Sequence, residues 1–401
     1  MKKIYKNLID AVVKITTSTI LENRHADGVI NYVLKTNPKW GARDRKFIGE
    51  SSYDIIRHLR HLSYAASTGT QTEEQIRKVV MAYLFINRLI DEPMLEGSGL
   101  KKEKLLQRYE EGKQIRKIRE SVPDWLDELG EQELGARWEK ELVALNKQAE
   151  VIIRVNSLKT NKRYLTEKFA EQNISVKENA TYPDALILEE RKNIFLTDEF
   201  KKGYFEIQDA SSQAVAYFAG VKPGMRVIDA CAGAGGKSLH MAAQMKNKGK
   251  ILSLDVEEKK LFELKKRAKR GGVSIIEPRL IDSSKVIKRL ADSADVVLLD
   301  VPCSGLGVLR RNPDAKWKLK KERIEELIKI QSEILSSYSS MVKKGGLLVF
   351  VTCSILPSEN ENQIKQFLSN HGDSFELLES KSVSPSESGF DGFFMAKLKR
   401  K

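Results

Sequence analysis

The chain has 401 residues, 41% of them hydrophobic and 31% charged, which excludes an intrinsically disordered protein and indicates two or three domains. Lysine and arginine outnumber aspartate and glutamate by 69 to 55, and the net charge of +14 favours a polyanionic partner. Three cysteines and five scattered histidines match no disulfide framework or zinc spacing, so we expect no metal site.

The amino terminus begins like a secretory signal peptide, with two lysines before an apolar stretch. Lys6, Asp10 and Lys14 interrupt that stretch, so it lacks the apolar core of a signal peptide. No run approaches the roughly 18 apolar residues that a membrane span requires. We therefore expect a cytoplasmic protein without membrane association.

Residues 1–149 are expected to form a helical domain, because apolar residues recur at helical spacing from Ile4 to Ile15 and again over 43–66. Thr72-Glu73-Glu74-Gln75 is typical of a capping box that opens a further helix. The polar stretch 91–112 is interpreted as a linker or a loosely held loop. A short helix between Asp27 and Pro38 and another beginning at Pro123 complete the domain.

Residues 150–219 are expected to form a small α+β unit. Apolar segments of strand length and helical patterns alternate there, and Pro223-Gly224 follows as a turn. The expected strands lie near 151–156, 174–177 and 185–188, and the expected helices at 161–172 and 211–219, the latter reached through residues 203–209.

Residues 220–401 are expected to form an α/β domain with a doubly wound, mostly parallel sheet, because strands and helices alternate regularly. Strands near 375–379 and 392–398 should add antiparallel edges. The other strands are expected at 226–231, 250–255, 275–281, 295–301 and 345–352, and the helices at 237–246, 257–270, 284–291, 321–342 and 360–370.

A glycine-rich turn and acids at strand ends favour a nucleoside-type cofactor at the carboxyl edge of this sheet. Asp255 is placed to bind ribose hydroxyls, Asp282 suits an adenine amino group, and Asp300 ends the next strand. The turn departs from the G-x-G-x-x-G pattern of dinucleotide enzymes. Together these residues predict S-adenosylmethionine binding, with a loop formed by Cys231, Ala232, Gly233, Ala234, Gly235, Gly236 and Lys237.

All three cysteines stand at the carboxyl ends of predicted strands, where ligands bind in open α/β sheets. For Cys231, a small buried hydrophobe explains the position equally well. Cys303 and Cys353 lie in Pro-Cys-Ser and Thr-Cys-Ser contexts, which favour chemistry. A thiolate that adds to C6 of a cytosine makes C5 nucleophilic toward a methyl donor. Asp300 could then hydrogen-bond the protonated N3 of the adduct.

The two cysteine motifs and the loop resemble the Sun/Nop (RsmB-like) family of RNA cytosine-C5 methyltransferases. The likeness is strong over 150–401, where it includes Gln208-Asp209, Arg310-Arg311-Asn312-Pro313-Asp314 and Asp391-Gly392-Phe393-Phe394. Over 1–149 it is looser and resembles a NusB-like RNA-binding domain, mainly at Arg43-Asp44-Arg45. Ala234 departs from the proline usual in the family loop, so we expect a less rigid loop that still binds the cofactor.

The resemblance implies that Cys353 is the nucleophile and that Cys303 assists release of the adduct. It also implies an RNA partner, most simply ribosomal RNA, and a monomeric enzyme. A basic cluster directly after the Cys303 turn suits phosphate contacts beside base stacking. We therefore expect an RNA-binding rim formed by Arg310, Arg311, Lys316, Trp317 and Lys318.

The expected architecture is a helical NusB-like domain over 1–149, an RNA-recognition-like α+β unit over 150–219 and a methyltransferase domain over 220–401. The expected function is methylation of C5 of cytosine in 16S ribosomal RNA. Transfer RNA is the alternative substrate. A non-catalytic ribosome-assembly factor of the same fold is the alternative function, and a nicotinamide oxidoreductase conflicts with the loop pattern.

Overall fold

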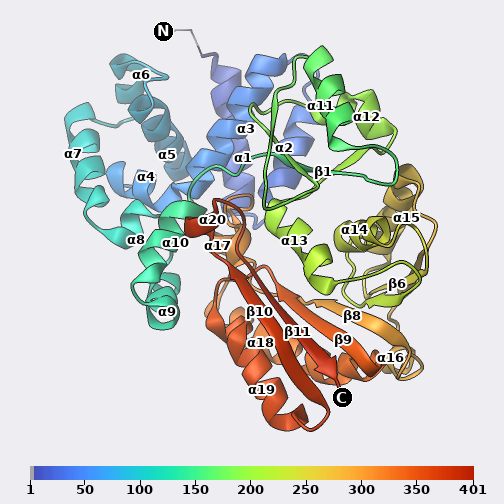
Figure 1. The fold of residues 1–401 in the computed structure, drawn as a ribbon. Helices are drawn as coiled ribbons and strands as arrows, with labels where there is room; N and C mark the ends of the chain where they lie inside the picture. Colours follow the sequence, from blue (N-terminus) through green and yellow to red (C-terminus); the bar gives the residue numbers. More distant parts are fainter. Residues whose placement is uncertain (1–3) are drawn as a thin grey trace. The chain divides into compact units, whose positions relative to one another are not determined.

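The computed structural model describes residues 4–401 (Figure 1). Residues 1–3, the basic start considered above for a signal peptide, lie outside the described residues. The chain divides into two compact units, the first comprising the residues up to Lys147 together with Leu309–Lys321. The second comprises Gln148–Val308 and Glu322–Lys401. Within residues 4–401, no helix combines the length and the apolar character needed to cross a membrane.

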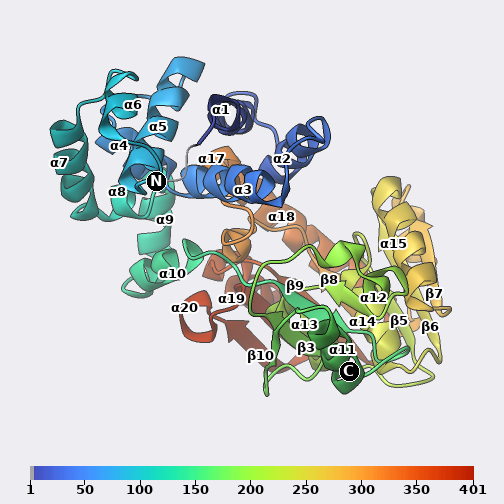
Figure 2. The same ribbon diagram turned by 90° about the horizontal axis from the view of Figure 1, so that it is seen from above.

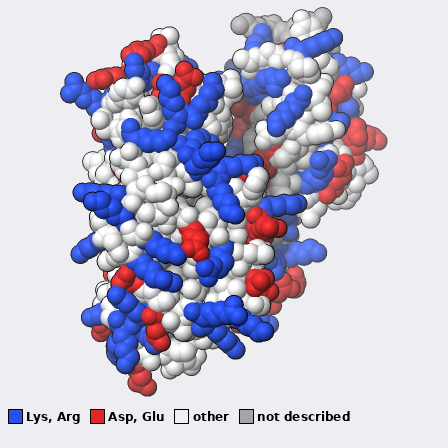
Figure 3. All heavy atoms as spheres, turned by 90° about the vertical axis from the view of Figure 1, so that its right-hand side faces the viewer, with Lys and Arg blue, Asp and Glu red and all other residues white. Residues whose placement is uncertain are grey.

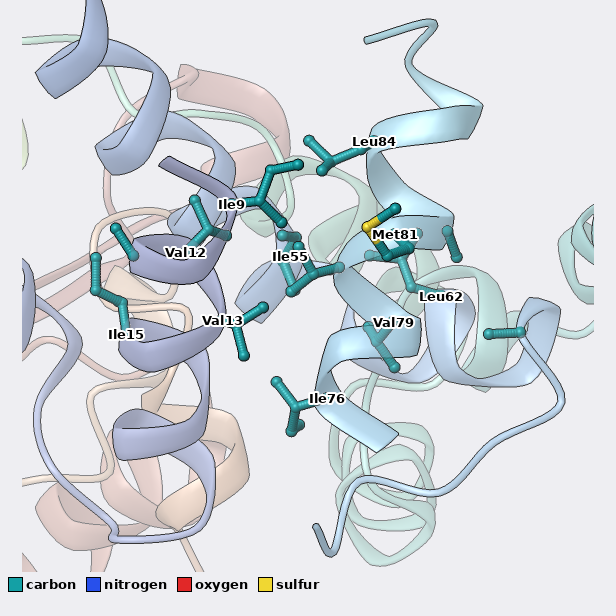
Figure 4. Packing of buried hydrophobic residues seen from close by; sticks show 14 of the residues in the cluster. Ile9, Val12, Val13, Ile15, Ile55, Leu62, Ile76, Val79, Met81 and Leu84 are labelled. Atoms are coloured by element: carbon teal, nitrogen blue, oxygen red, sulfur yellow. The ribbon is translucent and has the colours of Figure 1, made fainter. Parts of the chain in front are cut away.

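The first unit is helical, as predicted. Its core lies between α1, α3 and α5, where Val12, Ile55 and Ile76 are fully buried (Figure 4). The Thr72 side chain caps α5 by accepting the N–H of Gln75 at 3.2 Å. The helices are α1 (Lys6–Ile20), α2 (Ala26–Lys35), α3 (Ala42–Arg57), α4 (Leu59–Ala65), α5 (Glu73–Ile86), α6 (Glu92–Glu96), α7 (Lys102–Lys113), α8 (Arg116–Arg119), α9 (Asp124–Leu134), α10 (Arg137–Leu145) and α17 (Ala315–Lys318).

The polar stretch 91–112 is not the linker that we expected from its composition. It forms α6 and α7, because Leu95, Leu100 and Leu105 are buried in the core of the helical unit. Three apolar side chains facing the core are enough to hold a mostly polar segment in helical form.

The predicted helix over 43–66 is divided into α3 and α4, and the end of α3 leaves backbone carbonyls without helical partners. The segment Leu309–Lys321 supplies donors for them. The Lys316 ammonium donates to the carbonyl of Arg57 at 2.8 Å. The sequence analysis assigned this segment to the C-terminal domain, but by its contacts it belongs to the helical unit.

The second unit contains a small antiparallel sheet with the strand order β2-β3-β1-β4. Phe169 of α11 packs on Ile153, Leu186 and Phe205 of this sheet to form its own core. The sheet and its helices confirm the predicted α+β unit. The elements are β1 (Ile152–Val155), α11 (Lys162–Glu171), β2 (Val176–Glu178), β3 (Ala185–Leu188), α12 (Asp198–Lys201), β4 (Phe205–Ile207) and α13 (Ala210–Ala219).

A second sheet of seven strands has the order β10-β11-β9-β8-β5-β6-β7. The five strands from β9 to β7 pair in parallel, whereas β11 pairs antiparallel with both β9 and β10, as predicted. The elements are β5 (Arg226–Asp229), α14 (Gly236–Gln244), β6 (Lys250–Asp255), α15 (Glu258–Gly271), β7 (Ile276–Leu280), α16 (Ser284–Lys288), β8 (Ala294–Asp300), α18 (Lys321–Tyr338), β9 (Val342–Thr352), α19 (Glu361–His371), β10 (Phe375–Val383), α20 (Pro385–Ser388) and β11 (Phe393–Arg400).

Helices cover both faces of the large sheet (Figure 2). α13, α14 and α15 pack on one face, and α16, α18 and α19 pack on the other. This arrangement follows from right-handed crossovers that change direction at β5. The carboxyl ends of β5, β6, β8 and β9 therefore meet at one edge, and the candidate site is built there.

Candidate active site

The glycine-rich loop between β5 and α14 has backbone conformations that require glycine. Gly233 and Gly235 have φ angles of +54° and +81°. A Cβ at Gly235 would lie 2.5 Å from Leu264, so this position must also be small. The N–H of Gly233 donates to Asp255 at 2.8 Å, which ties the loop to the end of β6.

Two arginines donate hydrogen bonds to backbone carbonyls in the same loop and at the start of α14. Arg154 of β1 donates to the carbonyl of Gly236 at 2.7 Å, and Arg267 of α15 donates to the carbonyl of Ala234 at 2.7 Å. Burial lowers the pKa of Arg154 to about 10, which still leaves it cationic at neutral pH. The small antiparallel sheet thus takes part in shaping the loop, a contribution that the sequence analysis missed.

The start of the loop is anchored in the protein interior by Asp229 at the end of β5. Its carboxylate accepts a hydrogen bond from Ser238 at 2.6 Å, and Ser238 lies 2.8 Å from the hydroxyl of Ser253. Burial raises the pKa of Asp229 to about 7. These contacts fix the end of β5 and the first turn of α14 to each other.

Lys237 and Asp300 form an ion pair in the site, with 2.5 Å between the ammonium and the carboxylate. Burial opposes the charge of Lys237, but the neighbouring Asp300 and Cys353 outweigh this effect and raise the pKa of the lysine. Lys237 is therefore a fixed positive charge close to the Cys353 sulfur. The sequence analysis placed Lys237 only in the cofactor loop.

The structure brings Cys303 and Cys353 together, with their sulfur atoms 3.4 Å apart. Both thiols are partly accessible. The hydrogen bond with Cys353, with burial as the next cause, raises the pKa of Cys303 well above its usual value. Burial also raises the pKa of Cys231. The raised pKa of Cys303 favours the protonated form of this thiol.

The turn that carries Cys303 is held by a buried carboxylate that the sequence analysis missed. Glu359 is 0% exposed and accepts from the N–H of Ser304 at 2.8 Å and from its hydroxyl. The Gln331 amide bridges Glu359, at 2.9 Å, and the carbonyl of Pro302, at 3.0 Å. Glu359 lies six positions after Cys353 along the chain, so its contacts with Ser304 link the two cysteine turns.

Two glycines bring the Cys303 and Cys353 turns into direct backbone contact. The N–H of Gly307 donates to the carbonyl of Cys353 at 3.0 Å, and its own carbonyl accepts from Gly392 at 2.8 Å. A Cβ at Gly307 would lie 2.2 Å from the Gly392 oxygen. A Cβ at Gly392 would lie 2.6 Å from the Ile355 side chain and 2.9 Å from the Cα of Gly307, so both positions require glycine for the two turns to meet.

The other predicted cofactor residues lie at the same sheet edge and differ in their burial and in their hydrogen bonds. Asp255 is buried, and its oxygens accept the N–H groups of Gly233 and Glu257. Asp282 is exposed and hydrogen-bonds only its neighbour Ser283 among the contacts that are described. Asp255 therefore shapes the loop, in addition to any contact it makes with a ligand.

The predicted RNA-binding rim is not an exposed rim, and this expectation needs correction. Lys316 is 1% exposed, and its ammonium donates to the carbonyls of Arg57 and Glu120 and to the Asn146 side chain. Arg310 is also buried. The Lys316 nitrogen is therefore engaged with carbonyl groups inside the helical unit and is not presented to an external ligand.

The remaining residues of the expected rim are also engaged in the helical unit to different extents. The Trp317 indole donates to the carbonyl of Ile56 at 2.7 Å, and Lys318 donates to the carbonyl of Arg24 at 2.7 Å. Arg311 is partly exposed. A contact between Arg311 and RNA therefore stays a prediction.

The residues at the carboxyl edge fit S-adenosylmethionine. A Cβ added at Gly233 would meet no atom within 4 Å, so the loop faces open space where a ligand can approach its backbone. The carboxylates of Asp255 and Asp300 end the two strands that flank the loop strand, and they are suited to accept hydrogen bonds from hydroxyl and amino groups. Asp255 would bind the ribose, and the loop from Cys231 to Lys237 would line the cofactor.

Comparison with known proteins gives consistent matches. Residues 217–399 match the family described as 16S rRNA methyltransferase RsmB/F, and residues 122–195 match the ferredoxin-like domain of RsmF/B-like methyltransferases. A probable ribosomal RNA small subunit methyltransferase B from Synechocystis sp. is 32% identical, and the alignment covers 94% of this chain and 95% of that protein.

Two further matches agree. Ribosomal RNA small subunit methyltransferase B from Escherichia coli O6:K15:H31 is 33% identical over 69% of this chain and 66% of its own length. The crystal structure of a methyltransferase homologue from Pyrococcus horikoshii is 28% identical, with a TM-score of 0.63, over 71% of this chain and 98% of that one.

Proposed function

Because the chain belongs to the RsmB/F family of S-adenosylmethionine-dependent rRNA cytosine-5 methyltransferases, we propose that it methylates a cytosine of 16S ribosomal RNA through a covalent bond to Cys353. S-adenosylmethionine supplies the methyl group when bound. The observation that carries the covalent route is the 3.4 Å separation of the Cys303 and Cys353 sulfurs at the strand edge that bears the cofactor loop.

Cys353 is the attacking thiolate. Lys237 is held at the site by Asp300 and interacts favourably with a negative charge on Cys353, as the raised pKa of Lys237 indicates. Because its pKa is raised, Cys303 is the protonated neighbour, and its S–H can donate to the Cys353 sulfur 3.4 Å away. An ammonium and a thiol donor beside one sulfur stabilise a thiolate without the need for a histidine.

In the first step, the Cys353 sulfur bonds to C6 of the cytosine, and the electron pair of the C5–C6 double bond becomes available at C5. C5 then bonds to the transferred methyl group. Asp300 hydrogen-bonds the protonated N3 and offsets the charge that develops on the ring. Loss of the C5 proton restores the double bond and expels Cys353 as a thiolate. The base must leave its stack to reach the site.

Cys303 accepts the C5 proton in this scheme. Its own proton first passes to N3 of the ring as Cys353 adds to C6, which leaves Cys303 as a thiolate. The N3 proton is released to solvent when Cys353 is expelled, so one proton leaves for each methyl group transferred. The charge of Cys353 contributes to the raised pKa of Cys303. That charge disappears once the Cys353 sulfur is bonded to C6, so the Cys303 thiol becomes more acidic at the stage that needs a base. The pair thus exchanges roles during one turnover, with Cys353 anionic before addition and Cys303 anionic after it.

The test compares cysteine variants on 16S ribosomal RNA prepared from a strain that lacks the enzyme. Cys353→Ala should give neither 5-methylcytosine by bisulfite sequencing nor a covalent complex on a denaturing gel. Cys303→Ala should accumulate the covalent complex. Cys231→Ala is the matched control, because it removes a thiol of the cofactor loop that does not bond to the base, so it should form no lasting adduct even where methylation is slower.

Each alternative has its own result in the same experiment. An adduct that accumulates in Cys353→Ala and is lost in Cys303→Ala would reverse the two roles. Methylation of transfer RNA but not of 16S RNA would show that transfer RNA is the substrate. Unchanged methylation in both variants would overturn covalent catalysis, and a wild-type chain that methylates no RNA would favour an assembly factor.

A further inference from the structure

An open hollow of about 810 Å³ lies in the second unit, between the small antiparallel sheet and the carboxyl-terminal half of α15. Figure 3 views the side on which α12 and α15 lie in Figure 1, and lysine and arginine side chains gather on this face. Among the described residues, those that line the hollow include no carboxylate. Its basic residues are Lys159, Lys201, Lys202, Lys266, Lys269 and Arg270.

The floor of the hollow is rigid, because two side chains join its walls. The Lys159 ammonium donates to the carbonyls of Lys202 at 2.8 Å and Arg270 at 2.7 Å. Asn156 bridges the carbonyls of Gly203 at 2.8 Å and Gly271 at 2.9 Å. These bonds use carbonyls at the end of α15 that have no helical partner. The cations above this floor are therefore held in a fixed frame.

The positive charge of the hollow is only partly balanced. Arg270 is paired with Glu206, but the pairs of Lys201 with Asp198 and of Lys266 with Glu263 are exposed and therefore weak.

Lys202 and Lys269 are both exposed, and neither has a carboxylate partner among the ion pairs of the described chain. A concave surface with several cations and no lining carboxylate concentrates positive potential and attracts a polyanion.

We propose that this hollow binds phosphates of the RNA strand outside the target nucleotide, a role that rests on the proposed RNA substrate. The cations are distributed over two walls, which suits successive phosphates of a chain better than a single anion. Tyr204 also lines the hollow, and its ring lies in a T-shaped arrangement with that of Tyr164, with the ring centroids 6.0 Å apart. Tyr164 is 40% exposed and offers a face for base stacking beside the phosphate contacts.

The hollow is separate from the cofactor loop in its direct contacts. Arg267, which holds the Ala234 carbonyl, shares Glu206 with Arg270, but Lys202 and Lys269 make no contact with the loop among the hydrogen bonds of the described residues. Substitution of these two lysines should therefore change RNA binding and leave cofactor binding intact.

The test is the double variant Lys202→Gln/Lys269→Gln, with Lys365→Gln/Lys381→Gln as the matched control that removes two exposed charges near α19 and β10. Fluorescence anisotropy with a single-stranded 16S fragment should show severalfold weaker binding. The slope of log affinity against log salt should fall by about 1.4, from roughly 0.7 per lost contact to a single strand. KM for RNA should rise, and kcat and the calorimetric affinity for S-adenosylmethionine should not change.

Affinity and salt slope equal to those of the control variant would overturn the hollow as an RNA site, even if both proteins still methylate RNA. A wild-type protein that neither binds nor methylates RNA would overturn the proposed function itself, so the two failures are distinct. Lys202→Arg/Lys269→Arg should retain the wild-type slope, because the charge is kept.

Discussion

The guanidinium of Arg267 donates to the carbonyl oxygen of Ala234 at 2.7 Å and is paired with Glu206 at 3.0 Å. α15 and β4 together therefore fix the orientation of one peptide in the cofactor loop. The family's usual proline would restrict the backbone at position 234, and in this chain the arginine restrains the same peptide from outside.

The first prediction concerns cofactor affinity in Arg267→Lys. The single ammonium of lysine keeps the positive charge beside Glu206. It cannot reproduce the separate N–H groups of the guanidinium, which donate to Glu206 and to the Ala234 carbonyl at the same time. We expect S-adenosylmethionine to bind about fivefold more weakly in calorimetry, which corresponds to about 1 kcal/mol for one hydrogen bond. Arg279→Lys, on β7, is the matched control. A folded Arg267→Lys protein with unchanged affinity and melting temperature would show that the contact does not position the loop.

Local patterns in the sequence predicted most of the second unit. Strand and helix periodicity placed every strand of the large sheet, and the family resemblance paired the two cysteines that the structure brings together. These features are local, or they lie at strand ends that must meet at one edge in a parallel sheet.

The partners of Lys316 and Glu359 could not be predicted from sequence. Lys316 bonds to a carbonyl 259 positions away, and a lysine-rich segment has the same local pattern whether it is buried or solvated. Glu359 is one carboxylate in a polar stretch, and only the folded chain shows that Ser304 lies against it. Each of these two side chains is engaged by a tertiary contact with a backbone group. Such a contact leaves no periodic pattern in the sequence.

The second prediction tests the role of Glu359 in placing Cys303. Glu359→Ala removes the acceptors of the Ser304 N–H and hydroxyl in a fully buried place, so the Cys303 turn should shift. We expect kcat to fall about a hundredfold, as for misplacement of a reacting group by about 1 Å. The covalent RNA complex should accumulate as in Cys303→Ala.

Glu359→Gln keeps an acceptor for the Ser304 N–H and should recover most of the rate. Glu361→Ala, which lies two residues further along the chain, is the control and should behave like the wild type. Normal turnover in a folded Glu359→Ala protein would mean that Glu359 contributes only stability.

The third prediction is a pH dependence of the helical unit. Burial lowers the pKa of Lys316 to about 7, against about 10.4 for an unfolded lysine. Between these values the unfolded chain binds a proton that the folded chain lacks, so the free energy of unfolding should rise with pH from about 7 to about 10. Below about pH 7 both states are protonated, and this contribution no longer varies with pH.

Urea titrations followed by tryptophan fluorescence measure this effect selectively, because the four tryptophans at positions 40, 125, 138 and 317 all belong to the helical unit. Lys316→Met should lose the slope, and the exposed Lys320→Met should keep it. A slope that persists in Lys316→Met would mean that another group, and not Lys316, changes its protonation on unfolding in this pH range.

The last prediction uses the distance between the two active-site sulfurs. Cys303 and Cys353 lie 3.4 Å apart, and a disulfide requires about 2.05 Å, so a movement of about 1.4 Å would join them. With diamide as the oxidant, the two thiols lose two protons and two electrons and the diazene is reduced to the hydrazine. The product has no free Cys353 thiolate, so both covalent RNA complex and methylation should disappear and return after dithiothreitol. Non-reducing peptide mapping should find the two cysteine peptides joined.

Cys231→Ala should be inactivated like the wild type, whereas Cys303→Ala should keep forming the RNA adduct after diamide, because Cys353 then has no partner sulfur in contact. Equal loss of adduct formation in Cys303→Ala would show that diamide acts elsewhere, and an unlinked pair in the oxidised wild type would show that the two turns are too rigid to close.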